Sequence, residues 1–324
     1  MKKLLSILAF LRLIAFSNAS FANDNSLLSA DFWKTATPET VQQMIEKGDN
    51  VNDRDKYGQT PLMFASAFNT NPEVIIILLK KGANINDRTK EGFTSLMFAS
   101  SDNTNPEVIK ILLQNGANIK DRDKEGATAL MLAGESNPNP EVIETLLQNG
   151  ANINDRDALD RTSLMLACVS NTNPEVIKTL LQNGANINDR DVFDRTPLML
   201  ASASNTNPEV IATLLQNGAN IKDRSKFGTS PLIYASWFNS NPEVITILLQ
   251  NGANINDRDE DDWTPLMFAS RYSANPEVIT ALLQNGADVK AKNTDGKTAL
   301  DYAKENPKIY KTDVYWQMNN LMYE

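Results

Sequence analysis

Residues 170–191 read SNTNPEVIKTLLQNGANINDRD, and this stretch decides the fold because the chain repeats it. Residues 204–225 read SNTNPEVIATLLQNGANIKDRS and differ at three of 22 positions. A leucine recurs with a step of 34 residues, at Leu62, Leu96, Leu130, Leu164, Leu198, Leu232, Leu266 and Leu300. A fixed period of this length indicates an array of stacked structural repeats.

Each repeat carries the signals of two short helices. Thr60 and Pro61 are a helix cap followed by proline at the first helical position, and Asn71 and Pro72 repeat the device before an apolar run. Gly82 supplies the left-handed stop at the end of the second helix. Helices of two or three turns are too short to be stable alone, so each repeat needs its neighbours to bury its apolar face.

These residues resemble a known family. Thr-Pro-Leu-Met-Phe-Ala at 60–65, followed by Pro-Glu-Val-Ile-x-x-Leu-Leu-x-x-Gly-Ala-Asn-Ile-Asn at 72–86, closely resembles the ankyrin repeat, and the match extends over residues 26–324. The resemblance implies an all-α, curved solenoid of stacked helix-turn-helix units with β-hairpin-like connecting loops. It also implies a protein-binding role, through the hairpin tips and first helices of the concave side.

The register of the motif divides the chain. We expect residues 23–59 to form an N-terminal capping repeat, 60–297 to form seven central repeats, and 298–324 to form a C-terminal capping repeat. Tyr310, Tyr315 and Trp316 in the last segment are expected to seal the final apolar face. Cys168 follows an apolar run in a first helix, which predicts a core residue.

The repeats depart from the family pattern in three ways. Methionine, as at Met63, replaces the family histidine, so we expect softer apolar packing to hold the stack. Asn-x-Asn-Pro between the helices contains one extra residue, which lengthens the turn. An Asp-Arg pair stands where the family often has alanine, as at 53–54 and 87–88, and we interpret the recurring pairs as a solvated charge ladder.

Candidate binding residues come from comparing the repeats with one another. The second helix scarcely varies, whereas the hairpin tips and the ends of the first helices vary and carry large apolar side chains. These candidates are Tyr57, Phe68, Phe93, Leu159, Phe193, Phe227, Trp237, Phe238, Trp263 and Tyr272. Exposed aromatic side chains are typical of interface hot spots, although packing against adjacent repeats is the alternative. The candidates in the late repeats, Phe193, Phe227, Trp237, Phe238 and Trp263, are the strongest.

The composition argues against most catalytic sites. The chain has no histidine and one cysteine, which excludes histidine general bases, histidine-ligated metals and internal disulfides. Its net charge of −9 makes nucleic acid a poor partner. The acidic tip at 257–262 lacks the glycine and glutamate of a calcium loop. Asp160, Asp194 and Asp262 replace a tip glycine, and we expect left-handed backbone there, which aspartate tolerates. We therefore predict no catalytic residue, no cofactor, no metal, no small-molecule substrate and no enzymatic activity.

The N-terminus resembles a secretory signal. Lys2 and Lys3 precede a largely apolar run, and small residues at Ser20 and Ala22 fit cleavage after Ala22, although Arg12 interrupts the run. An uncleaved membrane anchor and a disordered tail are the alternatives. We expect a non-catalytic scaffold, periplasmic or secreted and typical of bacteria, that binds a protein partner and keeps no stable membrane span after cleavage. An effector acting on another cell, or an enzyme with an unrecognised site, are the alternatives.

Overall fold

The structure is a computed structural model that describes residues 26–324, so the predicted signal at 1–22 lies outside the described residues. The chain divides into two compact units, unit 1 ending at Asn152 and unit 2 covering Ile153–Glu324. Both consist of helices joined by turns, and residues 26–324 contain no strand. The predicted solenoid of paired helices is confirmed, while the connections are hydrogen-bonded turns rather than regular β-hairpins.

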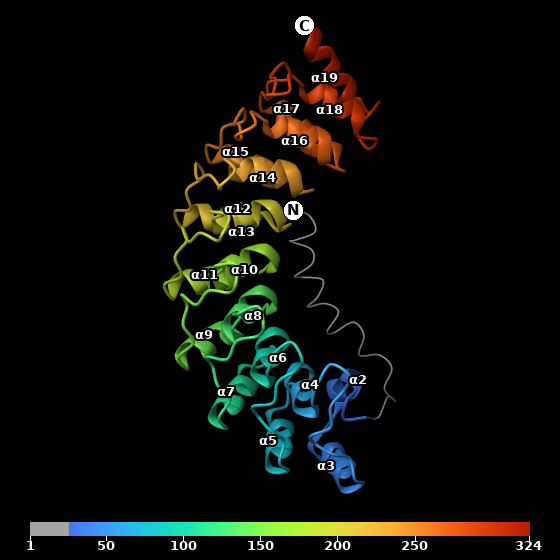
Figure 1. The fold of residues 1–324 in the computed structure, drawn as a ribbon, viewed down its shortest axis with the longest axis vertical. Helices are drawn as coiled ribbons and strands as arrows, with labels where there is room; N and C mark the ends of the chain where they lie inside the picture. Colours follow the sequence, from blue (N-terminus) through green and yellow to red (C-terminus); the bar gives the residue numbers. More distant parts are fainter. Residues whose placement is uncertain (1–25) are drawn as a thin grey trace. The chain divides into compact units, whose positions relative to one another are not determined.

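Successive first helices stack on each other within each unit, and so do successive second helices (Figure 1). The first helices are α2 (Ala30–Thr35), α4 (Pro61–Phe68), α6 (Ser95–Asp102) and α8 (Ala129–Ser136) in unit 1, and α10 (Ser163–Ser170), α12 (Pro197–Ser204), α14 (Pro231–Phe238), α16 (Pro265–Tyr272) and α18 (Ala299–Glu305) in unit 2. The second helices are α3 (Pro38–Glu46), α5 (Pro72–Lys80), α7 (Pro106–Gln114) and α9 (Pro140–Gln148) in unit 1, and α11 (Pro174–Gln182), α13 (Pro208–Gln216), α15 (Pro242–Gln250) and α17 (Pro276–Gln284) in unit 2. A final helix, α19 (Asp313–Tyr323), packs on α17 and α18.

The helix boundaries follow the predicted capping chemistry. The Thr60 hydroxyl accepts a hydrogen bond from the Met63 amide at 3.4 Å, and the Asn71 side chain accepts one from the Glu73 amide at 3.0 Å. Gly82 follows α5 with φ of 90°, the left-handed conformation predicted for the stop. Local residue choices therefore fix where each helix begins and ends.

The core consists of apolar side chains from both helices of every repeat. Leu62 and Met63 of α4 and Val74, Ile75 and Leu78 of α5 are each at most 1% exposed. Burial of methionine at the family's histidine position agrees with the predicted apolar packing.

Apolar packing is not the only force between repeats, because an amide ladder runs through the buried inter-helix turns. The Asn103 Nδ2 donates to the carbonyl oxygens of Ser66 and Asn69 in the preceding repeat, at 2.9 Å each. Asn69, Asn137, Asn205, Asn239 and Asn306 make the same pair of bonds to their preceding repeats. The recurring asparagine is therefore a polar contact between repeats. It acts in addition to the apolar packing, which was the only inter-repeat force predicted from the sequence.

The Asp-Arg pairs also connect repeats, which corrects the interpretation of a solvated ladder. The Arg54 guanidinium lies 2.6 Å from the Asp87 carboxylate of the next repeat and donates to the Arg88 carbonyl oxygen at 3.2 Å. Arg190 pairs with Asp223 in the same way at 3.1 Å. The arginine side chains are about 40% exposed and the aspartates 10–16%, so these are inter-repeat ion pairs at the surface.

The C-terminal cap agrees in part with the prediction. Tyr315 is buried at 6% exposure and seals the last repeat together with Ile309 and Met318. Tyr310 and Trp316 are 44% and 50% exposed, and each contacts the buried Tyr315 ring edge-on. One aromatic residue therefore closes the core, and the other two remain at the surface.

Candidate partner-binding surface

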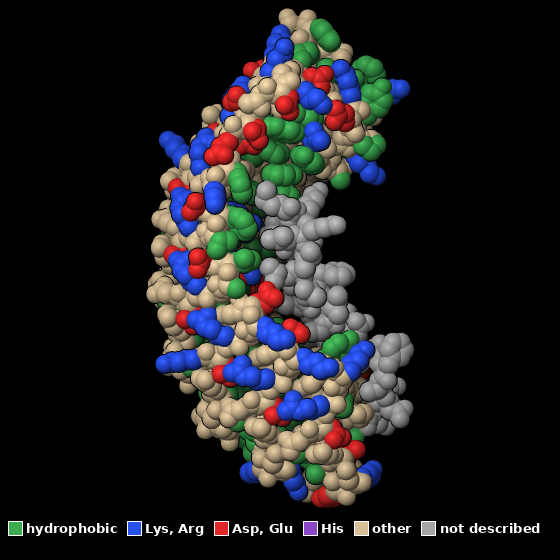
Figure 2. All heavy atoms as spheres, viewed as in Figure 1, with side chains coloured by type: hydrophobic (Ala, Val, Ile, Leu, Met, Phe, Trp, Pro, Cys, Tyr) green, Lys and Arg blue, Asp and Glu red, His purple; other side chains and the backbone are tan. Residues whose placement is uncertain are grey.

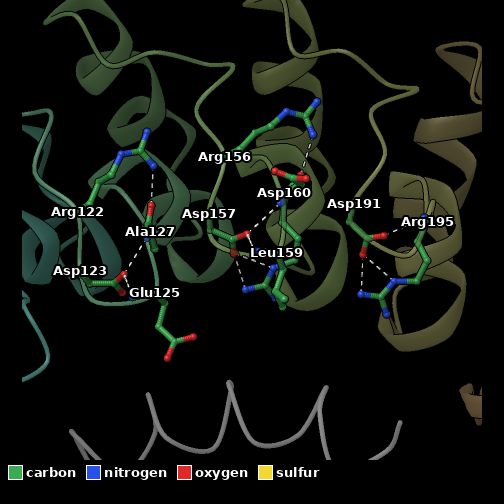
Figure 3. Close-up of polar contacts among 12 residues, drawn as sticks. Arg122, Asp123, Glu125, Ala127, Arg156, Asp157, Leu159, Asp160, Asp191 and Arg195 are labelled. Atoms are coloured by element: carbon green, nitrogen blue, oxygen red, sulfur yellow. Dashed lines mark hydrogen bonds and ion pairs between the residues drawn. The ribbon is translucent and has the colours of Figure 1, made fainter.

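The hairpin tips and first helices form one continuous face within each unit, here called the tip face. The side chain of the first residue in each tip accepts hydrogen bonds from backbone amides of the same tip. In unit 2, Asp191 Oδ1 accepts hydrogen bonds from the backbone amides of Phe193 and Arg195, both at 2.9 Å, and Oδ2 accepts from Arg195 Nε at 2.7 Å (Figure 3). Asp157 holds its own tip in the same manner. The tip side chains are thus presented from fixed backbone positions.

Aspartate at the apex of a tip adopts the predicted left-handed backbone. Asp160, Asp194 and Asp262 have φ values of 57°, 57° and 60°. Glycine occupies this position in other tips, for example Gly92 with φ of 92°. These aspartates therefore serve backbone geometry, which confirms the interpretation from the sequence.

Aromatic rings from three successive repeats of unit 2 assemble into one group, here called the aromatic cluster. Its members are Trp237, Phe238, Trp263, Phe268, Tyr272 and Tyr302. Trp237 stacks on Phe238 with ring centroids 4.5 Å apart and lies 4.7 Å from Phe268. Trp263 stacks on Tyr302 at 4.3 Å. Figure 2 shows hydrophobic side chains gathered over α14 and α16, with acidic groups beside them.

Charged side chains cover part of the aromatic cluster. The Arg271 guanidinium lies 5.6, 5.4 and 5.1 Å from the ring centres of Trp263, Tyr272 and Tyr302, within the range of cation–π contacts. Lys297 bonds to Glu305 at 2.9 Å, and this contact raises the pKa of the lysine and lowers that of the glutamate. Lys297 also lies 5.3 Å from the ring centre of Tyr302, so the cluster already accommodates two cations against its ring faces.

The ten candidate residues do not form one uniform surface. Phe227 and Tyr272 are the exposed members, at 41% and 38%, and the other eight are half-buried. Trp237, Phe238, Trp263 and Tyr272 lie together in the aromatic cluster, whereas Leu159, Phe193 and Phe227 lie on separate tips of unit 2. Tyr57, Phe68 and Phe93 belong to unit 1.

Several candidates pack against buried groups that span adjacent repeats, as the alternative anticipated. Phe68 and Phe93 contact a buried group in unit 1 that includes Met63 and Phe98. Phe238 similarly contacts a buried group around Tyr234. A role of these residues in binding stays a prediction.

Comparison of the variable positions missed Phe268, Tyr302 and Arg271. Phe268 and Tyr302 occupy the fifth position of the Thr-Pro-Leu-Met-Phe-Ala motif, a core slot that holds leucine at 132, 166 and 200. The same slot is aromatic in the early repeats, at Phe64 and Phe98, so its return from leucine to aromatic residues at 234, 268 and 302 is a weak signal in the sequence. Arg271 stands where other repeats carry a small, acidic or aromatic residue, and its position over three rings explains the exchange.

The tips of the two units differ in charge. The three central positions of each tip in unit 2 hold six acidic residues and one basic residue, Lys226; these positions are 158–160, 192–194, 226–228, 260–262 and 294–296. The tips at 56–58, 90–92 and 124–126 of unit 1 hold three lysines and two glutamates. The aromatic cluster therefore lies beside an acidic rim, whose centre is Glu260, Asp261 and Asp262.

The remaining reactive groups serve the fold. Cys168 is fully buried in α10, as predicted, and burial raises the pKa of its thiol. Within residues 26–324, no group of three or more acidic, cysteine or histidine side chains is arranged to hold a metal ion. None of the helices in this range combines the length and hydropathy of a bilayer-spanning segment.

Comparisons with known proteins agree with this geometry. Family models described as "Ankyrin repeats (3 copies)" match residues 32–123, 67–157, 96–191 and 164–259, and the model "Ankyrin repeats (many copies)" matches residues 248–303. The crystal structure of the human ASB11 ankyrin repeat domain is similar, with a TM-score of 0.62 and 28% identity, over 71% of this chain and 98% of that chain. No curated protein sequence matches the chain.

Proposed function

Because this chain belongs to the ankyrin repeat family, whose fold is typically a non-catalytic scaffold for protein–protein interaction, we propose that it binds a protein partner through the tip face of unit 2. The contact residues are Phe227, the exposed Tyr272 and the half-buried members of the aromatic cluster, Trp237, Phe238 and Trp263. The partner is held by burial of aromatic surface, and no covalent chemistry is involved.

One observation carries this proposal: large aromatic side chains occupy solvent-facing positions next to a rigid group of stacked rings. A ring whose backbone is fixed by the tip loses little conformational entropy on binding, so its burial contributes most of its hydrophobic free energy to affinity. Phe227 and Tyr272 leave about two fifths of their surfaces available for burial. Aromatic anchors of this kind are enriched among interface hot spots.

Affinity capture with the tagged protein tests the surface. Phe227→Ala and Tyr272→Ala are each expected to weaken capture of a stoichiometric partner about tenfold, the effect of a moderate hot spot. Tyr323→Ala is the matched control, because Tyr323 is 80% exposed at the end of α19 and lies outside the aromatic cluster. Equal capture by all four proteins, or loss of helical circular dichroism in the Phe227 and Tyr272 variants, contradicts the assignment.

We also propose that the chain is exported and acts in the periplasm or outside the cell. The support is the basic, then apolar, then small-residue order of residues 1–22. N-terminal sequencing of the protein from an extracytoplasmic fraction is expected to begin at Asn23. A membrane-bound protein that retains residues 1–22 would indicate an anchor, and a cytoplasmic protein would contradict export.

A further inference from the structure

The chemistry around the aromatic cluster points to the class of partner. We propose that the tip face of unit 2 binds a basic segment of a partner protein, in which arginine or lysine residues flank an apolar anchor; this inference rests on the proposed function. The apolar anchor packs on Trp237 and Tyr272, and the cations meet the acidic rim at Glu260 and Asp261.

Charge complementarity is the first argument for a basic occupant. The central tip positions of unit 2 carry a net charge of −5, against +1 for those of unit 1. Glu260 and Asp261 are both exposed, and Glu260 lies against the neighbouring tip, with its Cγ 3.1 Å from the position of a Cβ on Gly228. The acidic rim therefore extends toward Phe227, which precedes that glycine. Fields of one sign steer and orient a partner of the opposite sign.

The electrostatics of the rim itself support the same conclusion. Desolvation raises the pKa of Asp259, and the neighbouring charges of Asp261 and Asp262 raise it further. Asp259 also accepts hydrogen bonds from the backbone amides of Asp261 and Trp263 at 3.0 and 2.8 Å, which fix its own carboxylate, while the Asp262 carboxylate lies 3.5 Å from the Arg258 guanidinium. Repulsion among carboxylates held this close is relieved when a cation binds.

The ring faces are a second argument, because they already bind a guanidinium group. The Arg271 guanidinium, in the last turn of α16, lies within 5.6 Å of three ring centres. Trp237 stacks on Phe238 and on Tyr272, and Tyr272 is one of the three rings that Arg271 contacts. A partner arginine or lysine gains the same cation–π attraction on the aromatic surface, and an acidic side chain is repelled by the negative ring faces.

Peptide binding to the full chain tests the proposal. Three fluorescein-labelled peptides of about ten residues, each spanning ~33 Å when extended, serve as probes in anisotropy titrations. The first alternates arginine and leucine, the second replaces every arginine by glutamate, and the third replaces every leucine by serine. We expect the first to bind, the second not to bind, and the third to bind much more weakly because it lacks the anchor.

The double variant Glu260→Gln with Asp261→Asn is expected to weaken the arginine–leucine peptide about tenfold at low salt, equivalent to ~1.4 kcal/mol. The loss shrinks in about 1 M salt, where screening is strong. Glu91→Gln with Glu125→Gln is the matched control. These two glutamates occupy exposed tip positions of unit 1, and their replacement removes the same two negative charges as the rim variant. We expect this control to bind like the unchanged protein.

Each other outcome overturns the proposal in a distinguishable way. If the glutamate peptide binds as tightly as the arginine–leucine peptide or more tightly, and Tyr272→Ala abolishes that binding, a basic partner is refuted but the proposed binding surface is supported. Undiminished binding of the serine peptide refutes the apolar anchor. The proposed binding surface is also refuted if none of the peptides binds, or if their binding is unchanged by every substitution in the aromatic cluster and the acidic rim. If the mass measured by sedimentation rises with protein concentration and the rim variant abolishes that rise, the occupant is a second copy of this chain.

Discussion

Replacing Asn103 by alanine tests whether the amide ladder holds the repeats together. Asn103 is 1% exposed, and its Nδ2 satisfies the Ser66 and Asn69 carbonyl oxygens at 2.9 Å each. Its Oδ1 also accepts from the Asn105 amide at 3.0 Å. A buried polar group that loses its partner costs about 1–3 kcal/mol, and partial relaxation limits the sum. We therefore expect Asn103→Ala to lower the free energy of unfolding by about 2–4 kcal/mol.

The assay is urea unfolding followed by circular dichroism, read as a shift in midpoint at constant slope. Asn103→Asp is a second variant of nearly equal volume, which keeps the acceptor but turns a carboxylate toward the two carbonyl oxygens, so we expect at least an equal loss. Asn118→Ala is the control, because this exposed asparagine bonds only within its own loop and should cost less than about 1 kcal/mol. A loss in Asn103→Ala no larger than that of Asn118→Ala refutes the reasoning.

The converse change adds a missing amide. Ser273 occupies the ladder position in the loop after α16, and its hydroxyl bonds to Asn275 within that loop. Ser273→Asn offers an Nδ2 to the preceding repeat and is expected to raise the urea midpoint. An unchanged or lower midpoint would show that the spacing between α14 and α16 does not admit the bond.

Three further perturbations address the surface and the tips. Arg190→Gln removes the exposed pair with Asp223 and is expected to cost at most about 1 kcal/mol, with thermal unfolding measured at low salt and at about 1 M, where the cost should nearly vanish. Gly92→Ala should lower stability by ~1–3 kcal/mol in urea unfolding, because φ is 92° and a Cβ would lie 3.2 Å from the next tip's backbone. Asp301 has a pKa below its ordinary 3.8, chiefly because its carboxylate accepts a hydrogen bond from the backbone amide of Thr298, the N-cap of α18. Its contribution to the free energy of unfolding is therefore complete above pH 3.8 and is lost at lower pH. Asp301→Asn should reduce this acid sensitivity in a pH series of unfolding curves.

The sequence was sufficient for features that depend on neighbouring residues. The caps at Thr60 and Asn71 and the left-handed backbone at Asp194 follow from each residue's own chemistry and were predicted correctly. Contacts between repeats were harder to predict because they depend on the inter-repeat spacing. The Asn103 amide bonds to backbone carbonyls 34 and 37 residues earlier, and Arg190 reaches the next repeat, so neither partner is visible in a local pattern.

The candidate surface shows the same division. Variation among repeats identified Trp237, Trp263 and Tyr272, because positions at the tips and at the ends of the first helices differ from repeat to repeat. It missed Phe268 and Tyr302, since a core position that changes from leucine to an aromatic residue remains apolar. These buried rings stack on half-buried rings of other segments, and that contact cannot be read from the pattern of one repeat.

Ser273 has a mechanical consequence for unit 2. An amide hydrogen bond is short and directional and fixes the distance between two repeats, whereas stacked rings can slide over each other with little change in contact area. The serine stands at the junction of α14 and α16, where Trp237 stacks on Tyr272 at 5.6 Å. At this junction the repeats are therefore joined by stacked rings and by bonds near the surface, such as that from Asn275 Nδ2 to the Ser240 carbonyl oxygen, in place of the buried amide that links the other repeats.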